Sequence, residues 1–225
     1  MDHPGAVLFD AYGTLFDVYS VAETAERLFA GQGQALAAGW RDKQIEYTRL
    51  VTTSDDGAHY QPFGELTRAA LRYTCKRLGL GLTEAAEQQL MGQYRTLTAF
   101  PECREVLQAL KRRGVVTGIL SNGDPGMLDA AVQSAGLEGL LDHVLSVDGI
   151  RKYKTHPEAY RLGLTATGLA PAQIAFVSCN GWDALGATWY GFRTLWVNRY
   201  QLPFEELGTS PERTGTSLRD VLGFF

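Results

Sequence analysis

Short, continuous apolar runs recur along this chain, and each is typical of a strand that is buried on both faces. The first run covers residues 6–9, and later runs cover 115–120, 144–145, 174–177 and 194–197. A strand with one solvated face would instead alternate apolar and polar residues. Helical patterns lie between most of the runs, so the sequence predicts an α/β fold with a doubly wound, Rossmann-like parallel sheet.

The first and second runs lie about a hundred residues apart, far more than a parallel crossover needs. The excess predicts a helical cap inserted at residues 16–97 into a core formed by 1–15 and 98–225. Glycine-rich and Asp-Gly breaks divide the insert into four predicted helices: 21–29, 34–52, 63–78 and 83–94. Residues 208–217 are interpreted as a surface loop before a short C-terminal helix.

The charge balance and the cysteines narrow the possible function classes. With 21 Lys and Arg against 25 Asp and Glu, the formal net charge is −4, the wrong sign for neutralising nucleic-acid phosphates. Cys75, Cys103 and Cys179 lack the spacing of a disulfide framework or zinc site. Neither a leader-like start nor an apolar run of about 18 residues is present. We therefore expect a cytoplasmic protein that binds neither nucleic acid nor a membrane.

Small polar residues follow the predicted strands, where ligands of doubly wound folds gather. They are Asp10, Ser121-Asn122-Gly123, Asp148 and Ser178-Cys179-Asn180. Asp10 is the most suggestive of these positions, because a glycine after it lets the chain turn back and Thr14 can then reach its carboxylate. The ends of the parallel strands are therefore the predicted site.

Several motifs in chain order carry a resemblance to a known family. They are Asp10-x-x-Gly-Thr14, Trp40-Arg41-Asp-Lys-Gln-Ile-Glu-Tyr47, Ser121-Asn-Gly, Lys154 ahead of His-Pro, and Ser178-Cys-Asn-Gly-Trp-Asp183. Together they resemble the haloacid dehalogenase superfamily over nearly the whole chain, and the second motif resembles the cap helix of the L-2-haloacid dehalogenases. The resemblance implies a homodimer that hydrolyses short-chain L-2-haloalkanoic acids to D-2-hydroxy acids with inversion.

The number of carboxylates separates two chemistries within this superfamily. Its phosphatases carry a second Asp two positions after the nucleophile, and they hold magnesium with carboxylates from the first and last motifs. Here Tyr12 and Cys179 stand at two of those acidic positions, which leaves Asp10 and Asp183. A halide leaves without needing a proton, so displacement of halide without a metal or other cofactor fits the sequence better.

The resemblance also implies roles in a two-step reaction. Asp10 attacks and forms an ester, while Lys154 and Thr14 orient it, and Asp183 then activates the water that hydrolyses the ester. The expected orienting side chains are Tyr160 for the lysine and Ser178 and Asn180 for Asp183.

Other residues are expected to contact the substrate. Arg41 and Asn122 would receive the halide, and Ser121 with nearby backbone N–H groups would hold the substrate carboxylate. Tyr12 and Trp182 would form aromatic walls.

Two other functions stay open at this point: a magnesium phosphatase with an unusual first motif, and a catalytically silent relative that serves as a binding module. Single residues also have purely structural interpretations, in which Arg41 lies on the cap surface and Tyr160 or Trp182 serves only in packing.

One departure from the family is Thr155 in place of the usual proline. Thr155 and Glu158 predict a capping box at the start of the following helix.

Overall fold

The computed structural model describes residues 3–225. Met1 and Asp2, the first residues of the start that the sequence predicts is not a leader, lie outside the described residues. No helix within residues 3–225 is both long and apolar enough to cross a membrane.

The described chain forms one parallel sheet with the strand order β3-β2-β1-β4-β5-β6. The strands are β1 (Ala6–Phe9), β2 (Val116–Ser121), β3 (His143–Ser146), β4 (Ile174–Ser178), β5 (Arg193–Val197) and β6 (Arg213–Gly215). Ala6 pairs with Val116 on one side and with Ile174 on the other, so β1 lies in the middle of the sheet. The carboxyl ends of β1, β2 and β4 therefore lie side by side.

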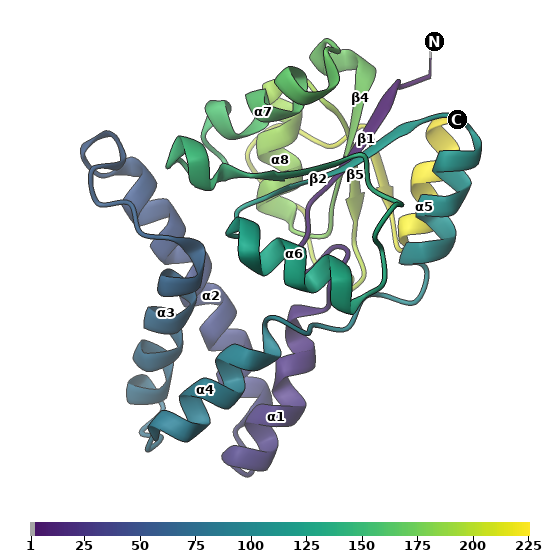
Figure 1. The fold of residues 1–225 in the computed structure, drawn as a ribbon. Helices are drawn as coiled ribbons and strands as arrows, with labels where there is room; N and C mark the ends of the chain where they lie inside the picture. Colours follow the sequence, from purple (N-terminus) through teal and green to yellow (C-terminus); the bar gives the residue numbers. More distant parts are fainter. Residues whose placement is uncertain (1–2) are drawn as a thin grey trace.

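Helices cover both faces of the sheet, as the doubly wound prediction requires (Figure 1). They are α5 (Cys103–Arg112), α6 (Pro125–Ser134), α7 (Pro157–Thr167) and α8 (Gly181–Tyr190), with a 3-10 helix, η5 (Leu218–Phe224), at the C-terminus. Val7 and Phe9 of β1 pack in the same cluster as residues of α5 and α6. Ala6 and Leu8 point the other way, into a smaller cluster with α7 and α8. The continuous apolar run of β1 follows from this burial on both faces.

The long connection between β1 and β2 forms a separate layer of helices that lies beyond one end of the sheet (Figure 1). It contains η1 (Val18–Ser20), α1 (Val21–Leu28), α2 (Gly33–Thr53), η2 (Asp55–Gly57), α3 (Phe63–Arg77) and α4 (Glu84–Gln93). Trp40 of α2 is fully buried at its centre, 4.9 Å from the Tyr94 ring, and donates its indole N–H to the Thr67 carbonyl. The packing of these helices against one another places α2 over the strand ends.

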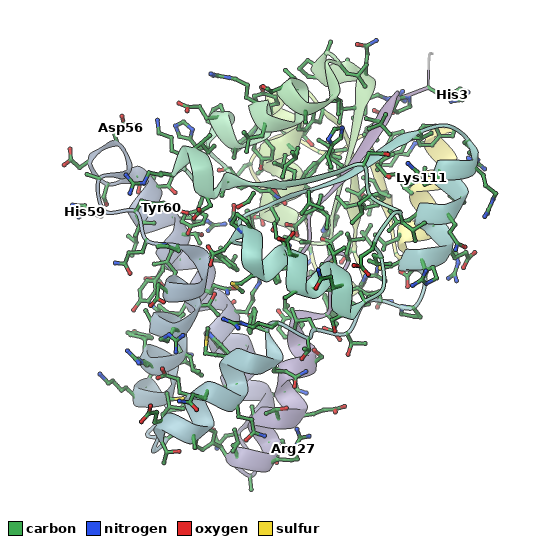
Figure 2. All side chains as sticks on the ribbon, viewed as in Figure 1. His3, Arg27, Asp56, His59, Tyr60 and Lys111 are labelled. Atoms are coloured by element: carbon green, nitrogen blue, oxygen red, sulfur yellow. The ribbon has the colours of Figure 1, made fainter. Side chains whose placement is uncertain are left out.

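Polar contacts fasten this helical layer to the core beside the strand ends. The Asp124 carboxylate accepts hydrogen bonds from the N–H groups of Phe63 and Gly64. These two N–H groups, at the start of α3, have no acceptor within the helix, so Asp124 caps it. The Tyr60 hydroxyl donates to Asp148 Oδ1 at 2.5 Å. Tyr60 lies near the tip of the α2–α3 connection in Figure 2, next to the core. Asp148, a strand-end residue, therefore contacts the cap and takes no part in the cluster described below.

Two sequence predictions of local structure are wrong. Residues 213–215 form the edge strand β6 inside the segment that was interpreted wholly as loop. The N-cap of α7 is His156, not Thr155, because the His156 Nδ1 accepts the N–H of Glu158. Pro157 does occupy the first turn of that helix, as predicted.

Candidate active site

The turn after β1 fixes the position of Asp10, the predicted nucleophile. The Asp10 N–H donates to the Val177 carbonyl at 2.9 Å, which continues the pairing of β1 with β4 by one residue. Gly13 then adopts a φ of +95°, a conformation that glycine accepts at little cost. The resulting loop returns Thr14 to Asp10, so its hydroxyl donates to Asp10 Oδ2 at 3.1 Å. The Thr14 oxygen also accepts the Cys179 N–H, which fixes the hydroxyl.

Both oxygens of the Asp10 carboxylate are held. The Lys154 ammonium lies 3.0 Å from Oδ1, and the Asn180 side-chain amide donates to Oδ2 at 2.8 Å. Asp10 is only 5% exposed. Its carboxylate is thus fixed in direction inside a site from which most water is excluded.

Asp183 faces the other side of the same lysine. Its Oδ2 accepts from Lys154 Nζ at 2.8 Å and from the Ser178 hydroxyl at 3.2 Å, and its Oδ1 accepts from the Tyr160 hydroxyl at 2.8 Å. Two expected contacts are therefore corrected. Tyr160 holds Asp183 and not the lysine, and Asn180 holds Asp10 and not Asp183.

Burial and charge shift the titration of this cluster. Burial alone would lower the pKa of Lys154, but the carboxylates of Asp10 and Asp183 raise it above its ordinary value, so the ammonium stays charged. Burial, helped by the negative charge of Asp10, raises the pKa of Asp183 to about 6 against the opposing effect of Lys154. Burial and the adjacent Asp183 carboxylate also raise the pKa of Tyr160, which remains a hydrogen-bond donor.

The loop after β2 holds the backbone of Lys154. The Asn122 side-chain oxygen accepts the Lys154 N–H at 2.9 Å, and Ser121, which is fully buried, accepts the Gly123 N–H on its hydroxyl oxygen. The Lys154 side chain is fully buried, whereas the nearby Lys152 pairs with acidic side chains at the surface. Of these two lysines, the one that the sequence motif ahead of His-Pro selects, Lys154, is therefore the one buried at the site.

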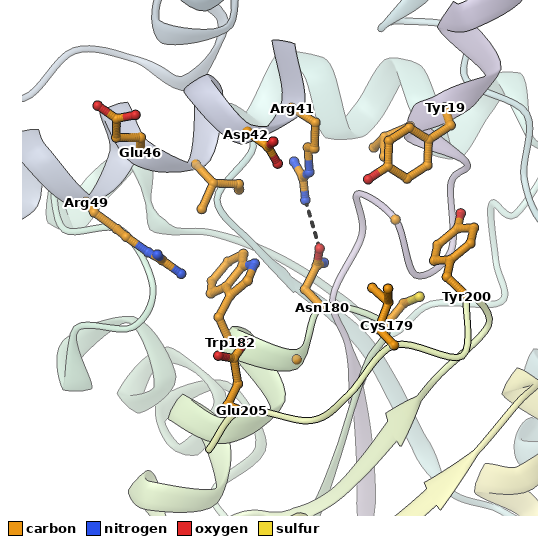
Figure 3. Close-up of a pocket in the computed structure, with 15 residues that line it drawn as sticks. Tyr19, Arg41, Asp42, Glu46, Arg49, Cys179, Asn180, Trp182, Tyr200 and Glu205 are labelled. Carbon is orange, nitrogen blue, oxygen red and sulfur yellow. Dashed lines mark hydrogen bonds between the residues drawn. The ribbon is translucent and has the colours of Figure 1, made fainter. Parts of the chain in front are cut away.

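The helical layer between β1 and β2, which corresponds to the predicted cap, places a cation at the strand ends. The guanidinium of Arg41, on α2, donates to the Tyr12 carbonyl at 2.9 Å, to Asn180 Oδ1 at 3.3 Å and to Gln44 Oε1 at 2.7 Å. Figure 3 shows Arg41 reaching down from α2 to Asn180. Since the same Asn180 amide donates to Asp10, a single side chain connects the cap arginine with the core carboxylate.

A cavity of about 580 Å³ lies between the cap and the core, and Arg41 and Asn180 are among the residues that line it. Trp182, at the start of α8, forms part of its wall, and the Arg49 guanidinium lies 5.4 Å from the Trp182 ring (Figure 3). Asp10 is hydrogen-bonded to Asn180, which lines this cavity.

Tyr12 forms an aromatic wall inside the protein. Its ring packs against Phe63 and Tyr94, and its hydroxyl is buried with no hydrogen-bond partner among residues 3–225. A Cβ on Gly123 would come within 2.6 Å of the Tyr12 ring, so this glycine is required by the close packing. The structure thus places an aromatic surface beside the strand ends.

Comparisons with known proteins agree with this geometry. The sequence profile of the haloacid dehalogenase-like hydrolases matches residues 4–191. This chain belongs to that family. An (S)-2-haloacid dehalogenase of Pseudomonas sp. (strain YL) is 44% identical over 225 residues, which is 100% of this chain and 96% of the relative. Haloacetate dehalogenase H-2 of Moraxella sp. (strain B) is 42% identical over 93% of this chain and 92% of its own.

Solved structures show the same similarity within the family. An L-2-haloacid dehalogenase of Xanthobacter autotrophicus with covalently bound chloropropionic acid superposes with a TM-score of 0.88 at 36% identity, covering 97% of this chain and 96% of that one. Another L-2-haloacid dehalogenase crystal structure gives a TM-score of 0.97 at 55% identity, covering 99% of each chain.

The donor set of this family member does not suit a magnesium ion. The Lys154 ammonium, within 3.0 Å of Asp10 and 2.8 Å of Asp183, already lies between the two carboxylates. Magnesium demands several hard oxygen ligands in near-octahedral geometry. Residues 3–225 contain no group of three or more His, Cys, Asp or Glu side chains placed to hold a metal ion.

The sequence motif on α2 predicts no role for one residue of the site, Gln44. Gln44 is fully buried and accepts a hydrogen bond from Arg41, three residues earlier on α2. Its spacing from Arg41 was the available signal, because residues three apart are neighbours on a helix. The partner of Gln44 on α3 could not be inferred from that spacing.

Proposed function

We propose that this protein hydrolyses the carbon–halogen bond of short-chain L-2-haloalkanoic acids and releases D-2-hydroxy acids with inversion. The observation that carries the proposal is the pairing of Asp10 and Asp183 through one buried lysine, with a cap arginine connected to Asp10 through Asn180. A nucleophile, a second carboxylate to activate water, and a cation for the departing halide are together what this hydrolysis requires.

In the first step the Asp10 carboxylate attacks the α-carbon. A bond forms between an Asp10 oxygen and that carbon, and the carbon–halogen bond breaks as the halide leaves with its electron pair. No proton transfer is needed. Lys154, Thr14 and Asn180 hold the carboxylate in line for the attack, which lowers the entropic part of the barrier.

The departing halide is received by Arg41 and Asn122. The Arg41 guanidinium supplies a positive charge where negative charge develops. Asn122 uses its side-chain oxygen on Lys154, so its NH₂ group is the part that can meet the halide. Tyr12 and Trp182 bound the apolar part of the substrate, and Ser121 with neighbouring N–H groups binds its carboxylate.

In the second step Asp183 accepts a proton from a water molecule, and the resulting hydroxide attacks the ester carbonyl carbon of Asp10. The acyl C–O bond breaks, and the leaving alkoxide takes the proton of the newly formed Asp10 carboxyl group, which frees Asp10 as a carboxylate and releases the hydroxy acid. Asp183 then returns its proton to the solvent. Ser178 and Tyr160 keep Asp183 in place. Because the α-carbon is not touched in this step, the inversion from the first step is retained in the product.

A chiral substrate panel with chelator tests this proposal against the phosphatase alternative. We expect halide release from L-2-chloropropionate with D-lactate as product, little release from the D-enantiomer, and no effect of excess chelator. Activity that is lost on chelation and restored by magnesium would contradict the proposal.

We further propose that residues 16–97 act as the cap, that residues 1–15 with 98–225 act as the core, and that the enzyme works as a cytoplasmic homodimer without a cofactor. The family resemblance supports the dimer, and the three unpaired cysteines, Cys75, Cys103 and Cys179, suit a reducing compartment. Light scattering of the purified protein tests the oligomeric state, with a monomer as the contrary result.

A further inference from the structure

A chain of buried hydrogen bonds runs from the cap arginine into α3. Gln44 Oε1 accepts from Arg41 Nη1 at 2.7 Å, and Gln44 Nε2 donates to the Thr67 hydroxyl at 2.6 Å. The Thr67 hydroxyl in turn donates to the Phe63 carbonyl at 2.7 Å. Gln44 and Thr67 are both fully buried, so water cannot substitute for either partner.

The direction of this chain is fixed by its last member. The Phe63 carbonyl can only accept, so it takes the Thr67 hydroxyl proton and leaves the Thr67 oxygen as an acceptor. That oxygen requires a donor, which is the NH₂ group of Gln44. The amide oxygen of Gln44 must then face Arg41. A backbone carbonyl of α3 thus determines which end of the Gln44 amide meets the guanidinium.

The acceptors around Arg41 are all neutral. They are the Gln44 amide, the Asn180 amide and the Tyr12 carbonyl, and no carboxylate within residues 3–225 forms an ion pair with this arginine. Elsewhere in the cap, Arg72 is paired with the Glu87 carboxylate at 2.6 Å. A neutral acceptor orients a guanidinium as a carboxylate does, but it leaves the positive charge available to an anion.

We propose that Gln44, held by Thr67, is a positioning residue that aims the Arg41 guanidinium at the leaving halide while keeping its charge uncompensated. The inference rests on the proposed function, because it assigns a role in the first step of that reaction. As the carbon–halogen bond breaks, the halide gains the electron pair, and the orientation of Arg41 is already set. No rearrangement of Arg41 is then needed at that moment.

Gln44→Glu is the sharpest variant, because it keeps the shape of the side chain and adds a carboxylate next to Arg41. We expect kcat for L-2-chloropropionate to fall by about 10²-fold, on the scale of losing one preorganised donor. We also expect inhibition by bromide to weaken by about tenfold or more, because the new carboxylate competes with the anion for Arg41. KM should change much less than kcat.

Thr67→Val removes the support for Gln44 and has a matched control in the same helix. Thr74 is also fully buried in α3, and its hydroxyl also donates to the carbonyl four residues before it. Thr74→Val removes one hydrogen bond where Thr67→Val removes two, so it should cost less stability and leave kcat and bromide inhibition unchanged. Thr67→Val should lower kcat by about three- to tenfold and weaken bromide inhibition, and Thr67→Ser should restore both, because it keeps the hydroxyl.

Bromide binding measured by tryptophan fluorescence quenching separates failure of this inference from failure of the proposed function. If the unaltered enzyme releases no halide from any haloacid, the proposed function fails, and the bromide affinities alone then decide the positioning role. If the enzyme is active and folded Gln44→Glu keeps both its kcat and its bromide affinity, the positioning role of Gln44 is overturned.

Discussion

Two buried cations, Lys154 in the core and Arg41 in the cap, have opposite surroundings. Lys154 lies between two carboxylates at 3.0 and 2.8 Å, whereas the partners of Arg41 among residues 3–225 are amide and carbonyl oxygens only. The positive charge of Lys154 is therefore neutralised inside the protein by Asp10 and Asp183, and it keeps these two carboxylates close together. The charge of Arg41 is left for a ligand.

This difference separates the two steps of the proposed reaction in space. The core cluster contains the groups that make and hydrolyse the ester, and the cap contains the charge that the halide meets. Asn180 connects the two regions, since its NH₂ group donates to Asp10 while its oxygen accepts from Arg41. Substitutions in the core should thus change covalent chemistry, and substitutions around Arg41 should change how the enzyme responds to halide.

The largest effect should come from a matched pair of isosteric changes in the core. Asp10→Asn should reduce halide release by roughly four or more orders of magnitude, because no nucleophile remains. Asp183→Asn should release about one halide per active site and then stop as a covalent ester, because the water is no longer activated. Intact-protein mass spectrometry after mixing with substrate checks both expectations. An adduct on Asp10→Asn, or none on Asp183→Asn, would reverse the assigned roles.

Removing the shared core cation should affect both stability and rate. Lys154→Met leaves two buried carboxylates without their counter-ion, so we expect the free energy of unfolding to drop by about 3–5 kcal/mol. Halide release should fall by about 10²–10³-fold, because the orientation of Asp10 is lost. Lys152→Met, in the same segment but paired at the surface, is the control and should change both quantities little. Urea unfolding and initial rates provide the comparison, and equal effects from the two variants would contradict it.

A smaller loss is expected when the cap cation keeps its charge but changes its shape. Arg41→Lys replaces a planar fork by a compact ammonium that cannot reach Gln44 and Asn180 together. Turnover should fall by roughly 10²-fold, while the protein stays folded with a loss of about 1–3 kcal/mol for a buried acceptor left without a donor. Arg72→Lys, which is paired with Glu87 away from the cavity, serves as the control. Near-normal turnover of Arg41→Lys would return this arginine to a role on the cap surface.

The smallest effect concerns pH. Asp183 must be unprotonated to accept a proton from water, so hydrolysis of the ester should slow as the pH falls through its pKa. Burial raises that pKa to about 6, with Asp10 acting in the same direction. Since esterification neutralises Asp10, we expect the limb for ester hydrolysis to lie no higher than about 6. Rapid-mixing rates at several pH values check this, and a limb near pH 8 would exclude Asp183 as the base.

Periodicity located the regular elements closely. The ends of the four predicted cap helices differ from α1, α2, α3 and α4 by at most one residue, and the predicted first strand coincides with β1. The apolar runs and glycine breaks are strong local signals, because these elements are buried on one or both faces. Arg213–Gly215 gave no such signal, because β6 is a short, polar edge strand held by backbone pairing with β5.

The site was harder to predict wherever a contact depends on how two elements pack. Motif positions placed Asp10, Lys154 and Asp183 near the strand ends, where the structure brings them together. The hydroxyl of Tyr160 meets Asp183 because α7 packs beside α8, an arrangement that spacing along the chain does not encode. The link from Gln44 to α3 depends in the same way on the packing of two cap helices.

The origin of the product oxygen tests the central claim most directly, because ester formation on Asp10 and direct attack by water yield the same hydroxy acid. A single turnover in oxygen-18 water with enzyme in excess should give unlabelled hydroxy acid and place the label in the peptide that contains Asp10. Labelled hydroxy acid in the first turnover, with an unlabelled Asp10 peptide, would instead show that water activated at Asp183 attacks the substrate itself, and it would contradict the covalent mechanism.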